Sequence, residues 1–219
     1  MTAAEIVLVR HAETNFNVEG RISSDPLDRQ CVLSQLGEQQ AARLAHELAH
    51  NEFDLCVTSQ LLRARQTAAV TMNGRDRRTV ARPEFNDVDA GIFNNRPAAD
   101  YLAWLTTTGS MGAVAPPNGE SLREAVERYT HAFEWLMDCR EAHVLVVTHA
   151  LPVALVLHAN QTSAPPNEEL LVGLFAQRAD EYGTTGTVRH AIPYRVTHGD
   201  LARAVDYWRT AISAKEAGA

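Results

Sequence analysis

A short aliphatic run near the N-terminus, Ile6–Val9, ends abruptly on a cationic pair, Arg10 and His11. β-Branched and aliphatic residues favour the interior of a sheet, whereas an unpaired cation is costly there. The run therefore predicts a buried strand that carries Arg10 and His11 at its carboxyl end. Open α/β sheets bind ligands at this end of their strands. A strand end is also an ordinary place for solvated charges, so the dipeptide alone leaves both interpretations open.

Strands and helices alternate along the rest of the chain. Two further buried runs, Asp54–Thr58 and Val144–Thr148, predict strands, and Leu170–Ala176 and Tyr194–Thr197 are interpreted as a strand and an edge strand. Apolar residues at helical spacing predict helices that begin near Ser34, cover Leu61–Met72, Ala98–Thr106, Glu120–Asp138 and Asp200–Ala214, and include Pro152. This alternation implies parallel pairing and an α/β fold, a three-layer α/β/α sandwich with a mainly parallel sheet.

Composition limits the classes of partner. With 219 residues and 45% hydrophobic content, residues 1–219 suit a single globular domain. The net charge is −7, the pI is near 5.7, and Lys215 is the only lysine. Nucleic acid and membrane surfaces are therefore not expected partners. Any attraction for an anionic substrate must come from locally placed arginines.

The cysteines and the absence of a leader-like segment favour a cytoplasmic location. Cys31, Cys56 and Cys139 are scattered and lack Cys-x-x-Cys spacing, so the sequence predicts neither a disulfide framework nor a zinc site. The chain shows no signal peptide and no apolar run of about 18 residues, the length that a membrane span requires.

The residues that could carry chemistry converge on the predicted strand ends. His11 and His149 each follow a buried strand, and Arg63 falls in the first turn of the helix after a third strand. If these strands are parallel neighbours, the three side chains and Arg10 face one crevice. Clustered cations repel one another unless an anion lies between them. Phosphate fits best, because the planar fork of arginine matches its oxygens and a helix N-terminus adds N–H donors.

Five collinear motifs spread over residues 5–158 resemble those of the histidine phosphatase superfamily, the phosphoglycerate-mutase-like proteins, and specifically its branch 1 phosphatases. The matching motifs are Arg10-His11-Ala-Glu13-Thr14-x-x-Asn17, Leu33-Ser-x-x-Gly37, Ser59-x-Leu-x-Arg63-Ala-x-Gln-Thr-Ala68, Pro117-x-Gly-Glu120-Ser121 and Val-Val-Thr-His149. The resemblance implies a mainly parallel sheet flanked by helices, and ester hydrolysis that needs no metal or organic cofactor.

The resemblance also implies a role for each matched residue. His11 corresponds to the nucleophile that accepts the phosphoryl group. Arg10, Arg63 and His149 correspond to the residues around the phosphoryl oxygens, and Asn17 to a further phosphate contact. Chemistry agrees with these roles, because a covalent phosphohistidine divides one difficult displacement into two easier steps and fixed cations stabilise the spread charge.

The general acid is the point at which this chain departs from the family. Relatives usually carry Leu-x-Glu-x-x-x-Gly, whereas this chain reads Phe85-Asn-Asp87-Val-Asp89-Ala-Gly91. Aspartate is one methylene shorter than glutamate, and proton transfer is sensitive to reach. Alignment on Gly91 places Asp87 at the acid position of the family, and the resemblance therefore implies that Asp87 is the general acid. Asp87 could act with a shifted backbone, Asp89 could replace it, or the site could accept only good leaving groups. Both could also be solvated loop carboxylates.

Three further features bear on the substrate. Arg21 is interpreted as a second substrate-binding residue beside Asn17. The segment 92–118 is expected to cover the crevice, and its Tyr101, Trp104 and Leu105 either line a substrate pocket or form a small satellite core, which is the favoured interpretation. Residues 163–219 form a divergent C-terminal part that matches no known motif.

The sequence therefore predicts a phosphatase that acts on a small phosphorylated metabolite through a phosphohistidine. One rival is a phosphoglycerate-type mutase, although the segment after the predicted acid, Gly91–Asn95, differs from the Gly-x-Leu-Gln-Gly of those relatives. The other is a catalytically silent protein that binds a phosphate ligand but lacks an effective acid. The oligomeric state stays open, with a homodimer as one option.

Overall fold

The chain folds around one five-stranded sheet in a computed structural model. The structure describes residues 5–73, 75, 77–107, 114–166, 168–176 and 188–213. The strands are β1 (Glu5–Arg10), β2 (Leu55–Thr58), β3 (Arg78–Ala81), β4 (His143–Thr148) and β5 (Pro193–Val196), in the spatial order β3-β2-β4-β1-β5. β1 to β4 pair in parallel, and β5 is antiparallel to β1 at one edge. The predicted mainly parallel sheet is thus confirmed.

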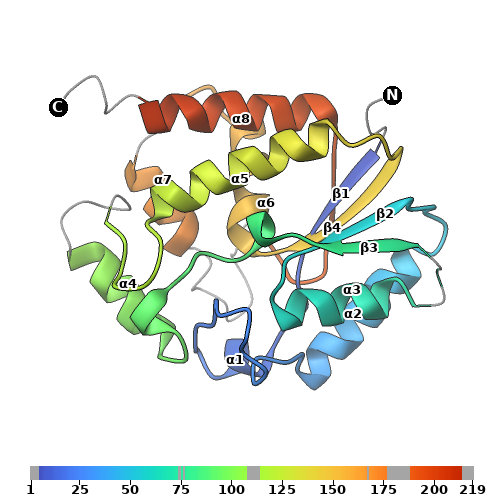
Figure 1. The fold of residues 1–219 in the computed structure, drawn as a ribbon, viewed down its shortest axis with the longest axis horizontal. Coiled ribbons are helices and arrows are strands. Elements are labelled where there is room, and N and C mark those ends of the chain that lie inside the picture. Colours follow the sequence, from blue (N-terminus) through green and yellow to red (C-terminus); the bar gives the residue numbers. More distant parts are fainter. Residues whose placement is uncertain are drawn as a thin grey trace.

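Helices cover both faces of the sheet (Figure 1). They are α1 (Asn15–Val18), α2 (Gln35–Glu47), α3 (Leu62–Thr71), α4 (Ala98–Thr107), α5 (Leu122–Met137), α6 (Ala150–Gln161), α7 (Glu168–Ala176) and α8 (His198–Ser213). Helices α2 and α3 pack together below the sheet in Figure 1, whereas α5 and α6 both pack against α8 on the other face. The predicted α/β/α sandwich is confirmed.

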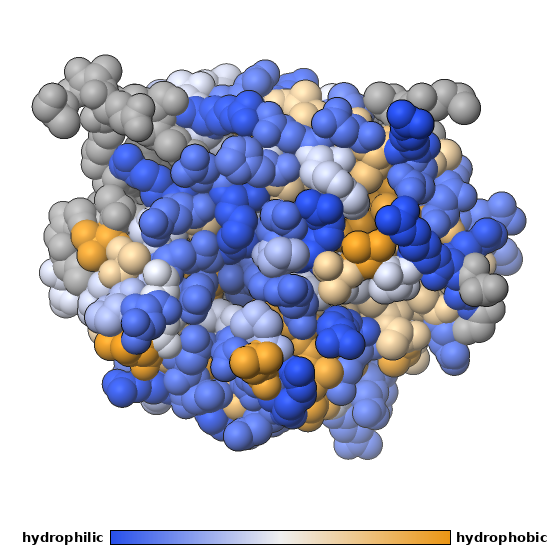
Figure 2. Space-filling model, viewed as in Figure 1, coloured by the Kyte–Doolittle hydropathy of each residue, from blue (hydrophilic) through white to orange (hydrophobic). Residues whose placement is uncertain are grey.

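Alternation along each strand divides the apolar core between the two faces. In β1, Val7 and Val9 belong to a cluster with α2 and α3, whereas Ile6 and Leu8 belong to a larger cluster with α5, α6 and α8. Successive side chains of a strand point to opposite faces, so a strand between two helical layers is apolar at every position. The face of the molecule seen in Figure 2 is largely hydrophilic, with apolar residues in small separate groups.

The register of the sheet aligns the strand ends that the sequence singles out. Arg10 of β1 lies opposite Thr148 of β4. The backbone N–H of His11 then donates to Thr148 O at 2.9 Å, and that of Ser59, after β2, donates to Val147 O at 3.1 Å. The segments that follow three adjacent parallel strands therefore leave the sheet at the same edge.

Local signals account for the helix starts. Ser34 Oγ accepts from the N–H of Gly37 at 3.0 Å, as expected of a helix cap. Ser121 and Glu124 form a reciprocal capping box at the start of α5. The last helix begins at His198, two residues before the predicted start, and the predicted end at residue 214 lies outside the described residues.

Two secondary-structure predictions were wrong or missing. The predicted strand Leu170–Ala176 is part of helix α7, in which Leu171, Val172, Leu174 and Phe175 are buried. A short apolar run does not distinguish a strand from a buried helix, because every position is apolar in both. Strand β3 was missed because it is a largely exposed edge strand without apolar alternation.

Candidate active site

The carboxyl end of β1 places Arg10 and His11 in the interior, where their side chains are 5% and 3% exposed. Nη1 of Arg10 donates to Val188 O at 3.1 Å. Nδ1 of His11 lies 2.8 Å from Ala12 O, an acceptor that requires the ring proton to be on Nδ1. This tautomer leaves the lone pair on Nε2, which is the nitrogen that faces Arg63.

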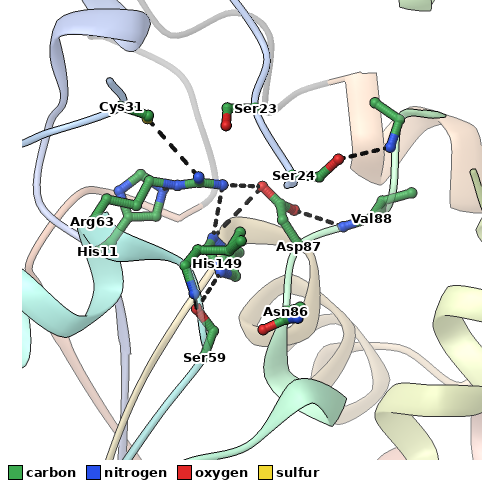
Figure 3. A network of polar contacts seen from close by, with 12 residues as sticks. His11, Ser23, Ser24, Cys31, Ser59, Arg63, Asn86, Asp87, Val88 and His149 are labelled. Atoms are coloured by element: carbon green, nitrogen blue, oxygen red, sulfur yellow. Dashed lines mark hydrogen bonds and ion pairs between the residues drawn. The ribbon is translucent and has the colours of Figure 1, made fainter. Parts of the chain in front are cut away.

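Arg63 is the centre of the cluster (Figure 3). It is the second residue of α3, and its Nε donates to His11 Nε2 at 3.0 Å. Its Nη2 lies 2.8 Å from Asp87 Oδ2 and 3.3 Å from His149 Nδ1. The hydroxyl of Thr67, one turn further along α3, accepts from the N–H of Ala12 at 3.0 Å and so joins the helix to the loop after β1.

His149 is completely buried at the start of α6, directly after β4. Its Nε2 lies 2.8 Å from Ser59 Oγ, and its Nδ1 lies 3.6 Å from Asp87 Oδ2. Ring centroids of His11 and His149 are 5.2 Å apart. We refer to Arg10, His11, Arg63 and His149 as the cage.

Asp87 lies between two short 3-10 helices, η1 (Pro83–Phe85) and η2 (Gly91–Phe93). We call residues 84–91, which include the adjoining ends of both helices, the acid loop. Asp87 is 2% exposed. Its Oδ1 accepts from the N–H of Val88 at 3.0 Å, while Oδ2 pairs with Arg63. The carboxyl group is therefore buried and directed at the cage.

Asp89 occupies a different position. Its Oδ1 accepts from the N–H of Gly91 at 3.0 Å and from Ser24 Oγ at 3.3 Å. Gly91 has a φ of +51°, and a Cβ there would lie 2.2 Å from Pro117 O, so this turn requires glycine. Asp89 thus stabilises the turn of the acid loop, whereas Asp87 contacts the cage.

The pKa of His11 lies well below its ordinary value of 6.5, mainly because burial disfavours the charged imidazolium. Repulsion from Arg63, His149, His190 and Arg10 lowers it further. His11 is therefore neutral at neutral pH, the form in which one ring nitrogen carries a lone pair. The two arginines nearby supply fixed positive charge that an incoming anion would neutralise.

A cavity of about 680 Å³, open mouth included, adjoins the cage. Asn17 lines it at the third residue of α1, where its Oδ1 accepts from the N–H and hydroxyl of Thr14 at 3.0 and 2.8 Å. Arg21 lines it at the rim, its guanidinium 3.9 Å above the Phe16 ring and 2.8 Å from Glu19. The structure thus places both predicted substrate-binding residues at the cavity.

The segment predicted to cover the crevice contributes α4 to the cavity wall. Tyr101 lines the cavity and also belongs, with Leu105, to the larger core cluster, and Trp104 packs against that cluster. The favoured interpretation as a separate satellite core was therefore wrong. Residues 108–113 of this segment lie outside the described residues.

Residues 6–170 match the sequence profile of the histidine phosphatase superfamily (branch 1). The chain belongs to this superfamily. A relative, adenosylcobalamin/alpha-ribazole phosphatase of Salmonella typhimurium, is 32% identical over an alignment of 161 residues. The match covers 68% of this chain and 76% of the relative. A protein named probable phosphoglycerate mutase GpmB, of Cronobacter sakazakii, is 27% identical over 70% of this chain and 73% of its own length.

The solved structure of alpha-ribazole phosphatase from Shigella flexneri is similar as well. It is 27% identical, covers 76% of this chain and 83% of its own, and superposes with a TM-score of 0.62. The family and its named phosphatases confirm the predicted enzyme class, a phosphoric monoester hydrolase. Within the described ranges, no helix is long and apolar enough to cross a membrane.

Sequence reasoning missed three residues at this histidine phosphatase site. His190 places Nδ1 2.8 Å from His11 O, with ring centroids 5.3 Å apart. Arg128 of α5 donates to the carbonyls of Glu84 and Asn86 in the acid loop. Ser59 lies in a recognised motif but received no role. His190 follows the matched motifs, and the contacts of Arg128 span more than 40 residues, so neither had a local signal.

Among the described residues, no three His, Cys, Asp or Glu side chains gather as a metal site. Cys31 lines the cavity, with Sγ 3.9 Å from Arg63 Nη1, and burial raises the pKa of its thiol. Metal independence stays a prediction.

Proposed function

We propose that this histidine phosphatase hydrolyses the phosphate ester of a small metabolite through a phosphohistidine on His11. The observation that carries the proposal is the state of the His11 ring. Its Nδ1 is committed to Ala12 O, and its lone-pair nitrogen faces Arg63 Nε at 3.0 Å. A buried neutral imidazole beside fixed cations is suited to attack a phosphoryl group.

In the first step, Arg63 Nε would leave His11 Nε2 and donate to a phosphoryl oxygen instead. The freed Nε2 attacks phosphorus, and an N–P bond forms as the bond from phosphorus to the ester oxygen breaks. The leaving oxygen takes a proton from the carboxyl of Asp87, which becomes a carboxylate. In the second step, that carboxylate takes a proton from a water molecule whose oxygen attacks phosphorus. The N–P bond breaks, inorganic phosphate leaves, and His11 and the protonated Asp87 are restored.

The cage would supply the charge stabilisation. Arg10, Arg63 and His149 would hold the phosphoryl oxygens, and the amide of Asn17 would donate to one of them. Preorganised donors in a buried site stabilise developing charge without reorganisation. Arg21, at the rim, would face the organic part of the ester.

The pairing of Arg63 with Asp87 supports a coupling between substrate binding and the acid. A phosphoryl dianion would compete with Asp87 for the guanidinium of Arg63. Because like charges close together cannot both be stabilised, the dianion would also favour the protonated carboxyl, which is the form that a general acid requires.

The test is to trap the intermediate. The enzyme is mixed with a radiolabelled phosphate ester and quenched in alkali, because phosphohistidine is labile in acid. We expect label on His11 in the wild type, and neither label nor turnover in His11→Ala. His50→Ala, which removes an exposed histidine, is the matched control and should behave as wild type. Label on Ser, Cys or Asp, or turnover by His11→Ala, would overturn the proposal.

A mutase is the second candidate, because one relative is named as a probable phosphoglycerate mutase. A mutase returns the phosphoryl group of the histidine to the organic molecule instead of to water. The same labelled enzyme distinguishes the two: release of inorganic phosphate supports the phosphatase, whereas a moved phosphate on an intact carbon skeleton supports the mutase.

A further inference from the structure

The cavity beside His11 has a polar end and an apolar wall. Its described lining includes His11, Arg63, Ile22, Tyr101, Leu102 and Phe175. The polar end contains the nucleophile and Arg63. The apolar wall comes from α4, α7 and the segment after α1. A phosphate ester held by the cage would extend its organic part along this wall.

The apolar wall is preformed in the structure without substrate. Tyr101 and Phe175 are 1% and 3% exposed, and their rings meet edge to face with centroids 5.5 Å apart. Tyr101 also stacks on Trp104 at 6.0 Å and contacts Phe93 at 5.4 Å. Aromatic side chains held by one another lose little conformational freedom when a ligand packs on them.

Two hydroxyls of the described lining, those of Thr14 and Ser23, are already engaged within the protein. The Thr14 hydroxyl donates to Asn17 Oδ1 at 2.8 Å, and the Ser23 hydroxyl donates to Asp28 Oδ2 at 2.6 Å. A sugar or polyol would need such groups for its own hydroxyls, and buried hydroxyls without partners are costly.

The described lining of the cavity also offers few charged groups to a substrate. Outside the cage, Arg21 is the one charged residue among the described residues that line the cavity, and it already pairs with Glu19. A second phosphate or a carboxylate on the substrate would have to compete with Glu19 for this partly exposed guanidinium. The described lining therefore suits a molecule with a single anionic group.

We propose that the substrate is a monophosphate ester whose alcohol bears an apolar ring and no second anion, with the ring packed on Tyr101, Leu102 and Phe175. The inference rests on the proposed phosphatase function and names its substrate class. Apolar contact of this kind changes kcat/KM by about 10–200-fold per methylene-sized contact. Discrimination in favour of ring-bearing esters should be at least ~10-fold on the same scale.

The test compares esters of primary alcohols, so that leaving groups are similar. The panel is benzyl phosphate, cyclohexylmethyl phosphate, glycerol 3-phosphate, glucose 6-phosphate and 3-phosphoglycerate. We expect kcat/KM for the first two to exceed that of the others by ~10-fold or more. Equal or better hydrolysis of the polar esters would overturn the substrate class and leave the phosphatase function standing. Hydrolysis of none of them would overturn both.

Two Leu→Ala variants in α4 test the contact itself. Leu102 lines the cavity, whereas Leu105, one turn along the same helix, is buried in the core and does not. Leu102→Ala should raise KM for benzyl phosphate about tenfold relative to KM for glycerol 3-phosphate. Leu105→Ala should leave the ratio between the two substrates unchanged. An equal change of this ratio in both variants would assign the effect to helix packing and overturn the proposed contact.

Discussion

The cage and the acid loop meet at Arg63 but are held in place by different means. The cage follows three parallel strands, and backbone hydrogen bonds from His11 and Ser59 continue the sheet into it. The acid loop relies more on side chains: Arg128 of α5 donates to the carbonyls of Glu84 and Asn86 and pairs with Glu120.

This difference has a consequence for function. A backbone framework survives the substitution of single side chains, whereas a loop held by side-chain hydrogen bonds can shift when one of them is removed. The acid loop also acts on the leaving group, and the cage acts on the phosphoryl group. The effects of substitutions on the rate should therefore depend on the leaving group in the acid loop and less so in the cage.

The largest effect that separates the regions is expected at Asp87. Asp87→Asn should slow hydrolysis of an alkyl phosphate by ~10²–10⁴-fold, the usual contribution of general acid catalysis. Hydrolysis of p-nitrophenyl phosphate should slow much less, because its leaving phenolate is stable without a proton. The measurement is kcat for both substrates.

Asp89→Asn is the matched control for this substitution. Since Asp89 stabilises the turn at Gly91, the variant should affect both substrates similarly and more mildly. Leaving-group discrimination in Asp89→Asn would transfer the acid role to that residue. Flat responses from both variants would favour the silent phosphate-binding protein.

Arg63→Lys should slow hydrolysis of both substrates by ~10²–10³-fold, as expected when one preorganised donor to a transition state is lost. The alkyl phosphate should be slowed somewhat more, because Arg63 also contacts Asp87. Lysine retains the charge but lacks the fork that contacts His11 and Asp87 together. Arg65→Lys, at an exposed position of the same helix, should have no effect. An unchanged rate for p-nitrophenyl phosphate in Arg63→Lys would contradict the role of Arg63 in stabilising the phosphoryl group.

Arg128→Met should slow alkyl phosphate hydrolysis by roughly 10-fold or more, because small displacements of a catalytic group are costly. p-Nitrophenyl phosphate and KM should change little, which distinguishes a positioning role from general destabilisation. Arg128→Lys should restore part of the rate. Arg123→Met, in the same helix, is the control. Equal losses on both substrates would argue against a role of Arg128 in placing Asp87.

The pKa of His11 tests whether the cage is as buried as the structure shows. Burial and Arg63 lower this pKa, so the neutral ring should persist as the pH falls through 6.5 and be lost only well below it. NMR titration of the His11 imidazole measures this directly, without interference from the titration of the substrate phosphate near pH 6. An inflection at or above 6.5 would contradict the buried environment described above.

The smallest effect is expected from metal removal. If the arginines of the cage neutralise the phosphoryl oxygens, a divalent ion is redundant there. Exhaustive EDTA treatment should therefore leave the rate unchanged with either substrate. A loss of activity that Mg²⁺ or Zn²⁺ restores would refute the proposed division of charge.

Periodicity and local signals predicted most of the fold. The runs that end at Arg10 and Thr148 are buried strands because apolar residues on both faces leave no other stable place for them. The cap at Ser34 was predicted because it depends only on its own neighbours. Strand β3 was not, because an exposed edge strand is specified by its partner β2 and not by its own residues.

For the candidate site, too, the sequence predicted features with local signals and missed contacts between distant segments. The strand-end histidines and Arg63 could be predicted to share a crevice, since parallel neighbours bring their carboxyl ends to one edge. The approach of His190 to His11 could not be predicted, because it depends on a connection across 179 residues. Asp87 and Asp89 differ by two positions in the chain, and no local property distinguishes their directions.

The sequence by itself determined the sheet, the helices and the residue types at the strand ends, because apolar periodicity and capping act over a few neighbouring residues. Only the tertiary structure decided that Asp87 faces Arg63 while Asp89 closes a turn. It alone also joined α4 and α7 into one apolar wall beside His11. The physical reason is that these contacts link segments far apart in the chain, whose relative positions depend on how the whole core packs.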